Sequence, residues 1–218
     1  MKFAHVLLLS LSLASPMALA AKYEPPAEDA RNPQPTEALK NFQRFEHRPV
    51  AVVPALAKKG DADTARIHLQ ANMAIRSIER TKVWNEAPAG ESPRTLVIEP
   101  IIEQVRFVTP GKRVFIGVLW GSSYVDLKLR LTDAATGQVI GEPHFYQRAG
   151  AGAAGWGMGV VDRAMLVRVT NMVDAYLRDN YAQPIETNVA IMPSDTPEQT
   201  LEKQELERRA NNAVNAGG

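Results

Sequence analysis

The stretch from Val125 to Leu131 constrains the fold more than any other part of this sequence. Apolar and charged residues alternate there one by one, in the order VDLKLRL. Successive side chains of a β-strand point to opposite sides of the sheet, so the pattern predicts a strand with one buried and one polar face. Asp133 to Gly137 predicts a hairpin loop in which Gly137 is free to adopt a positive φ. Gln138 to Arg148 is then the expected partner strand.

Two other segments have the periodicity of amphipathic helices. Residues 61–84 begin with Asp61 or Asp63 as a candidate cap for the free N–H groups. Residues 160–181 place apolar residues on one face of the expected helix and charged residues such as Asp174 on the other. The apolar residues at helical spacing in the first segment are Ile67, Leu69, Ala71, Met73, Ile75 and Ile78, and in the second Val161, Met165, Val169, Met172 and Tyr176.

Short strands are expected at residues 50–53, 95–107, 114–120 and 187–191. Pro100 interrupts the second of these, and because proline cannot donate to a ladder we expect it at an edge or a bulge. The order of helix, antiparallel strands and helix predicts an α+β fold. Its sheet would be antiparallel, with about four to five strands and two long helices packed on one face.

The first residues of the chain have the pattern of an export signal. Lys2 is followed by the apolar run VLLLSLSL and by Ala18-Leu19-Ala20, the small-x-small sequence that signal peptidase reads. The run is shorter than the roughly 20 residues that span a bilayer. Since the chain contains no cysteine, no lipid can be attached after cleavage. We therefore expect cleavage after Ala20 and a periplasmic product without a lipid anchor or disulfides.

Composition divides the chain into four parts. Residues 1–20 are the expected signal peptide, and residues 21–47 are rich in proline and are expected to form a linker. Residues 48–192 are the expected α+β domain. Residues 193–218 are polar, which predicts a largely disordered tail or a solvated helix.

Charge limits the kind of partner that the chain can bind. Lys2 is the only charged side chain in residues 1–20, so the processed chain would carry equal numbers of acidic and basic side chains. Such a chain has no overall field to attract DNA or RNA. After signal cleavage no integral membrane segment is expected. The expected partner is another envelope protein, and the oligomeric state is left open.

A glycine-rich segment, AGAGAAGWGMG, follows the predicted hairpin. Gly150, Gly152 and Gly155 match the spacing of a dinucleotide fingerprint, in which backbone N–H groups at a helix start hold a pyrophosphate. The strands around it nevertheless read as an antiparallel meander rather than as the parallel sheet that this motif requires. The segment is therefore interpreted as a connector, and no cofactor is expected.

No constellation of catalytic or metal-binding residues stands out. The histidines beyond residue 20, His47, His68 and His144, lie in separate segments without neighbouring ligands at metal spacing. Glu99 and Glu103 would share one face of a strand, where a carboxylate pair is usually solvated. We therefore expect no catalytic residue and no metal site. Trp156, isolated among glycines, is the candidate contact with a partner.

The sequence from Arg94 onward resembles an envelope family carried mostly by Gram-negative lipoproteins, the domain-of-unknown-function family 4410. The likeness lies in RTLVIEPIIEQV, in Pro110-Gly111-Lys112-Arg113, in VDLKLRLTDAATGQVI, and in the glycine-rich segment and closing helix. It covers about residues 48–184, although this chain lacks the cysteine that bears the lipid. The resemblance implies a small α+β envelope domain and supplies no functional residue.

These observations favour a non-enzymatic periplasmic envelope protein that acts as a binding or accessory component, or in assembly. Two alternatives remain open. One is a nucleotide- or cofactor-binding enzyme that uses the glycine-rich loop. The other is a structural subunit of an envelope oligomer.

Overall fold

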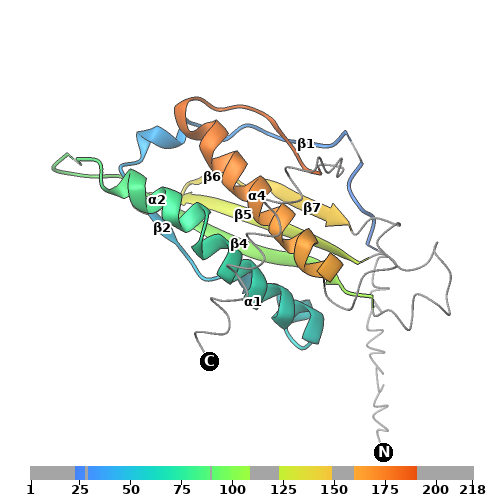
Figure 1. Cartoon of the computed structure of the whole chain (residues 1–218). Coiled ribbons are helices and arrows are strands. Elements are labelled where there is room, and N and C mark those ends of the chain that lie inside the picture. The colour runs from blue at the N-terminus through green and yellow to red at the C-terminus, as the bar shows by residue number, and fades with distance from the viewer. Residues whose placement is uncertain (1–22, 28, 89, 109–122, 149–159, 191–218) are drawn as a thin grey trace, which may run out of the picture.

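The computed structural model describes residues 23–27, 29–88, 90–108, 123–148 and 160–190, and it has the predicted α+β architecture. One layer is a six-stranded sheet. The other layer consists of helices that lie on a single face of that sheet (Figure 1). One apolar core fills the space between the two layers.

The centre of the sheet is an antiparallel pair, β4 (Thr95–Arg106) and β5 (Tyr124–Asp133). A turn with φ of 72° at Gly137, as predicted, leads from β5 into the next strand. The expected single partner strand is divided into β6 (Val139–Gly141) and β7 (His144–Arg148), which both pair antiparallel with β5. The predicted alternation of β5 is confirmed, because its apolar side chains are fully buried.

The other edge of the sheet corrects the expectation of an antiparallel meander. Strands β2 (Arg44–His47) and β3 (Ala51–Val52) both pair with β4 in parallel. The β2 ladder ends at Ile98 and the β3 ladder begins at Ile101. The expectation that Pro100 lies at an edge or a bulge was wrong. Pro100 lies within the central strand, between the two parallel ladders, where the missing N–H group costs no parallel pairing.

The ordered chain begins earlier than the predicted boundary at residue 48. Strand β1 (Arg31–Asn32) pairs antiparallel with β8 (Thr187–Asn188), and a 3₁₀ turn, η1 (Leu39–Asn41), follows. Leu39 and Phe42 are 0% and 1% exposed, so this segment supplies part of the core. Pro25, Pro26, Pro33 and Pro35 precede these few apolar residues, which is why composition alone indicated a linker.

The helix expected at residues 61–84 is two helices, α1 (Gly60–Ala74) and α2 (Ser77–Asn85). Arg76 separates them with φ of −129° and ψ of −89°, outside the helical region. The expected face is confirmed at Leu69 and Met73, which are buried, and was wrong at Ile67, which is 41% exposed. The buried residues of α1 are Ala62, Ala65, Leu69, Asn72 and Met73.

The expected cap of this helix was wrong as well. Lys59 occupies the N-cap position and makes no side-chain cap bond. Asp61 instead accepts a hydrogen bond from the Phe107 N–H through its Oδ2, at 2.9 Å. The carboxylate therefore fixes the end of β4 against the start of α1, which sequence spacing could not reveal.

The long helix α4 (Val160–Ala182) buries the predicted face, including Met165, Val169 and Tyr176. Asp174, expected on the solvated face, is 4% exposed. Its two oxygens accept hydrogen bonds from Nε and an Nη of Arg80, both at 2.7 Å. This bidentate pair joins α4 to α2.

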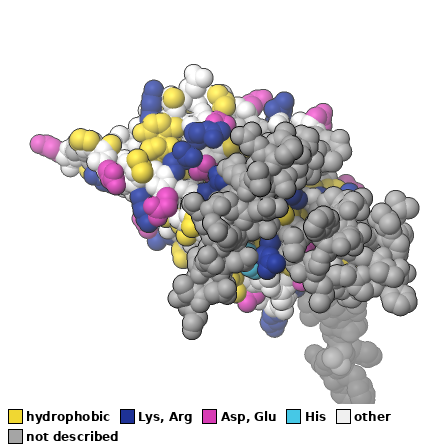
Figure 2. All heavy atoms as spheres, viewed as in Figure 1, with side chains coloured by type: hydrophobic (Ala, Val, Ile, Leu, Met, Phe, Trp, Pro, Cys, Tyr) yellow, Lys and Arg dark blue, Asp and Glu magenta, His cyan; other side chains and the backbone are white. Residues whose placement is uncertain are grey.

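Where Figure 2 shows coloured side chains on the face that carries the helices, acidic, basic and apolar side chains are interspersed. Neither sign of charge dominates this view. Among the described helices, none combines the length and the apolarity needed to cross a membrane.

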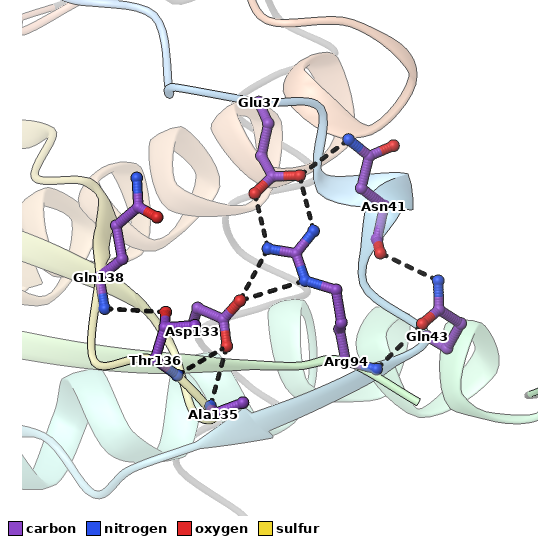
Figure 3. A network of polar contacts seen from close by, with 8 residues as sticks. All are labelled: Glu37, Asn41, Gln43, Arg94, Asp133, Ala135, Thr136 and Gln138. Carbon is purple, nitrogen blue, oxygen red and sulfur yellow. Dashed lines mark hydrogen bonds and ion pairs between the residues drawn. The ribbon is translucent and has the colours of Figure 1, made fainter. Parts of the chain in front are cut away.

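Arg94 ties the N-terminal segment to the sheet (Figure 3). Its guanidinium donates to both oxygens of Glu37, at 2.7 and 2.9 Å, and to Oδ2 of Asp133, at 2.7 and 3.1 Å. It also lies 4.3 Å from the centre of the Phe42 ring. Oδ1 of Asp133 accepts from the Ala135 N–H in the hairpin loop. Hydrogen bonds from Arg94 lower the pKa of Glu37 and that of Asp133.

Replacing Arg94 with Met should lower the thermal midpoint by several degrees. The change leaves the Asp133 side chain, which is 3% exposed, without its cation. Arg130→Met is the matched control, because the carboxylates near Arg130 are 37% and 40% exposed. The stabilisation from Arg94 is present above the usual carboxyl pKa values and is lost as pH falls, so the two midpoints should converge in acid. Equal midpoints for both variants at neutral pH would contradict this role.

Leu129→Ala should destabilise the domain by about 3 kcal/mol, because it leaves a cavity beneath the helices. Leu129 is 0% exposed at the centre of β5. Val139→Ala, at a residue that is 44% exposed on β6, should cost less than about 1 kcal/mol. Urea unfolding of both variants measures the difference. Similar losses would show that the buried face of β5 is assigned incorrectly.

Candidate functional site

The face of the sheet opposite the helices is here called the polar face. It carries the side chains that are able to bind a ligand or take part in chemistry. Its members from β4 are Glu99, Ile101 and Glu103, those from β5 are Asp126, Lys128 and Arg130, and those from β7 are His144 and Tyr146. Most of them are half-buried. They face this side because their neighbours along each strand point into the core.

Three elements converge on one point of the polar face. Lys128 pairs with His144 in the β5–β7 register, which places His144 beside Asp126. The β4–β5 register shifts between Ile102 and Gln104, so Glu103 is an extra residue on β4. This bulge brings the Glu103 carboxylate to the other two side chains.

Glu103, Asp126 and His144, here called the Glu–Asp–His cluster, offer ligand atoms within 4.8 Å of one another. The Nδ1 of His144 lies 3.5 Å from Oδ1 of Asp126 and 3.6 Å from Oε2 of Glu103. No metal site was expected here, because His144 has no neighbouring ligand at metal spacing in the sequence. The structure brings together the group types that ligate divalent metals.

The second oxygen of each carboxylate has a different partner. Lys128 Nζ lies 2.6 Å from Oε1 of Glu103, and the Tyr23 hydroxyl donates to Oδ2 of Asp126 at 2.9 Å. The Tyr23 ring stacks on Tyr124, with ring centres 5.2 Å apart, and lies 6.3 Å from Tyr146. The N-terminal segment thus covers one side of the cluster with an aromatic group.

Burial and charge shape the electrostatics of the cluster. The interaction with Asp126 raises the pKa of His144 most, and the charge of Glu103 raises it further. Partial burial of the imidazole opposes this rise. Burial, together with the Asp126 charge, raises the pKa of Tyr23, so its hydroxyl stays protonated and donates. The cluster can therefore bind a cation through its carboxylates and imidazole, or a polar group from a partner.

Glu99 and Glu103 do share a face of β4, as expected, but they do not form one site. Glu99 lies 3.9 Å from Arg130, whereas Glu103 pairs with Lys128 and faces His144. Each carboxylate thus has a separate cation.

The other sequence candidates are not at this site. His47 and His68 lie on β2 and α1, away from the Glu–Asp–His cluster. Trp156, Gly150, Gly152 and Gly155 lie outside the described residues. The cluster was not predicted from the sequence. The one signal that indicated it was that Asp126 and Lys128 share the polar side of the alternating strand.

The sequence matches no family model and no curated protein, so the resemblance to family 4410 stays a prediction. Among solved structures, the chain is similar to a PelC dodecamer from Paraburkholderia phytofirmans, with 17% identity over 66% of this chain and 95% of that one, at a TM-score of 0.37. It is also similar to the hypothetical protein CT253 from Chlamydia trachomatis, with 12% identity over 62% and 98%, at a TM-score of 0.33. Scores this low assign neither a function nor an assembly.

The stability of the domain should fall as pH drops from about 6.5 toward 5, in part through His47. Burial lowers the pKa of His47 to about 4, so the folded chain resists a proton that the unfolded chain accepts near pH 6.5. One such proton contributes at most about 1.4 kcal/mol per pH unit. His47→Gln should flatten the dependence of unfolding free energy on pH in this range. Identical slopes for the variant and the parent would contradict the assignment.

Proposed function

We propose that this chain is a non-enzymatic component of the cell envelope, acting in the periplasm by binding another envelope protein through the polar face. The observation that carries the proposal is the asymmetry of the two layers. The described helices all cover one face of the sheet (Figure 1), while the other presents charged and aromatic side chains from three strands.

The chemistry of the polar face supports recognition of a protein. Side chains of both charge signs alternate across it, as in the Glu99–Arg130 and Glu103–Lys128 pairs. Such patterns favour specificity because a partner must match their order. Tyr124, which is half-buried and lies on the same side of β5 as Asp126, adds a large, amphipathic ring of the kind enriched at protein interfaces.

The export signal supports the periplasmic location. Ala18-Leu19-Ala20 provides a processing site, and the absence of cysteine leaves no residue for a lipid. The resemblance to family 4410 is consistent with an envelope domain.

The alternative of a nucleotide-binding enzyme has less support. The strand that leads to the glycine-rich segment, β7, pairs antiparallel with β5. A dinucleotide fingerprint needs a parallel sheet beneath it, with the phosphate at the strand ends.

Photo-crosslinking in living cells tests the proposal. A photoreactive residue at Glu99, whose side chain is 37% exposed on the polar face, should give a discrete adduct with another envelope protein. The control position is Val83, which is 63% exposed on the helical layer and should give much less of it. An adduct from Val83 alone, or from neither position, would contradict the use of the polar face.

Cell fractionation with mass measurement tests the location in the same strain. A periplasmic product that starts at Ala21 is the expected result. A product that retains Met1, or one confined to the cytoplasm, would contradict the periplasmic assignment.

A further inference from the structure

We infer that the Glu–Asp–His cluster is a binding site for a divalent transition cation, of which Zn²⁺ is the best match. The ligands would be Oε2 of Glu103, Oδ1 of Asp126 and Nδ1 of His144. This inference goes beyond the proposed function and does not depend on it.

The distances from His144 to the two carboxylates suit a metal better than they suit direct hydrogen bonds, and the two carboxylate oxygens lie within 4.8 Å of each other. Zn²⁺ binds nitrogen and oxygen at about 2.0–2.2 Å in a tetrahedron, which sets neighbouring ligand atoms about 3.4 Å apart. The two separations from His144 Nδ1 are 3.5 and 3.6 Å. Both exceed the usual length of an N–H···O bond, about 2.9 Å.

A buried carboxylate oxygen of Asp126 supports the binding of a cation at this position. Asp126 is 8% exposed, and its buried Oδ1 accepts no hydrogen bond from the residues that the structure describes, since Nδ1 of His144 stays 3.5 Å away. Burying a carboxylate oxygen without a partner is unfavourable. A cation between Asp126 and His144 would satisfy this oxygen.

The groups around the cluster hold the carboxylates in the orientation that a metal requires. Lys128 contacts Oε1 of Glu103 and Tyr23 donates to Oδ2 of Asp126, and neither of these oxygens is a proposed ligand. Partners of this kind fix the orientation of metal ligands, and their loss typically weakens binding about 10- to 100-fold. Tyr23 and Lys128 would therefore support the site without touching the metal.

The donor set selects among metals. One imidazole and two carboxylates suit Zn²⁺ and its transition-metal neighbours, with Mn²⁺ bound more weakly. Ca²⁺ prefers about six to eight oxygen ligands and does not match a three-ligand site with one nitrogen. The side chains of His144 and Glu103 are 38% and 27% exposed, so solvent can supply a fourth ligand.

Isothermal titration of the untagged protein, purified as the cell processes it, tests this site with Zn²⁺. We expect one Zn²⁺ per chain with micromolar or tighter affinity, and no measurable binding of Ca²⁺. Glu103→Gln and His144→Gln should each weaken binding by about tenfold or more. Glu99→Gln, on the same face of β4, is the matched control and should leave the affinity unchanged. Tyr23→Phe, which keeps the ring but loses the bond to Asp126, should weaken binding about tenfold.

Circular dichroism of each variant establishes that the fold is retained. Should a variant fail to fold, Co²⁺ added to the unaltered protein provides a second measurement. Intense visible absorption bands of four-coordinate Co²⁺, displaced by one equivalent of Zn²⁺, would support the site. Absence of saturable Zn²⁺ binding, or equal losses in Glu99→Gln and Glu103→Gln, would overturn it.

Discussion

The antiparallel pairing of β4 with β5 is the interaction on which the other features depend. Every other strand of the large sheet joins one of these two, and the alternation along β5 sends leucines to one side and charges to the other. The helices bury the first side, and the second becomes the polar face. Because strand side chains alternate without exception in a regular ladder, the hydrophobic core and the Glu–Asp–His cluster are two consequences of one register. The bulge at Glu103 is the local departure that completes the cluster.

The N-terminal segment completes the core on one face of the sheet and covers part of the polar face on the other. Leu39 and Phe42 fill the core, Arg94 holds Glu37 against the hairpin, and Tyr23 covers Asp126. None of these contacts is local in sequence, since Tyr23 and Asp126 are 103 positions apart. The segment therefore gains its order from the folded sheet rather than from its own propensity, in accordance with its proline-rich composition.

Features set by short-range patterns could be predicted from the sequence. The alternation of β5, the positive φ of Gly137 and the apolar face of α4 follow from periodicity and from backbone freedom, and the structure has all three. Features that depend on long-range pairing could not be predicted. The parallel strands β2 and β3, and the meeting of His144 with Glu103, depend on which strands become neighbours. The β5–β6 register shifts between Leu131 and Thr132, so a regular hairpin built from the turn at Gly137 did not predict that His144 lies opposite Lys128.

The pairing of β1 with β8 determines how the domain responds to force. Arg31 lies opposite Asn188 and Asn32 opposite Thr187, so the chain enters and leaves at the same end of a two-residue antiparallel ladder. A pull between the two ends would load the hydrogen bonds of this ladder one after another, as in unzipping. Strands pulled from opposite ends would instead share the load in shear. Once Tyr23 had left Asp126, the small sheet would open before the β4–β5 pair, so tension between the N-terminal and C-terminal sides could detach the edge of the domain without unfolding its core.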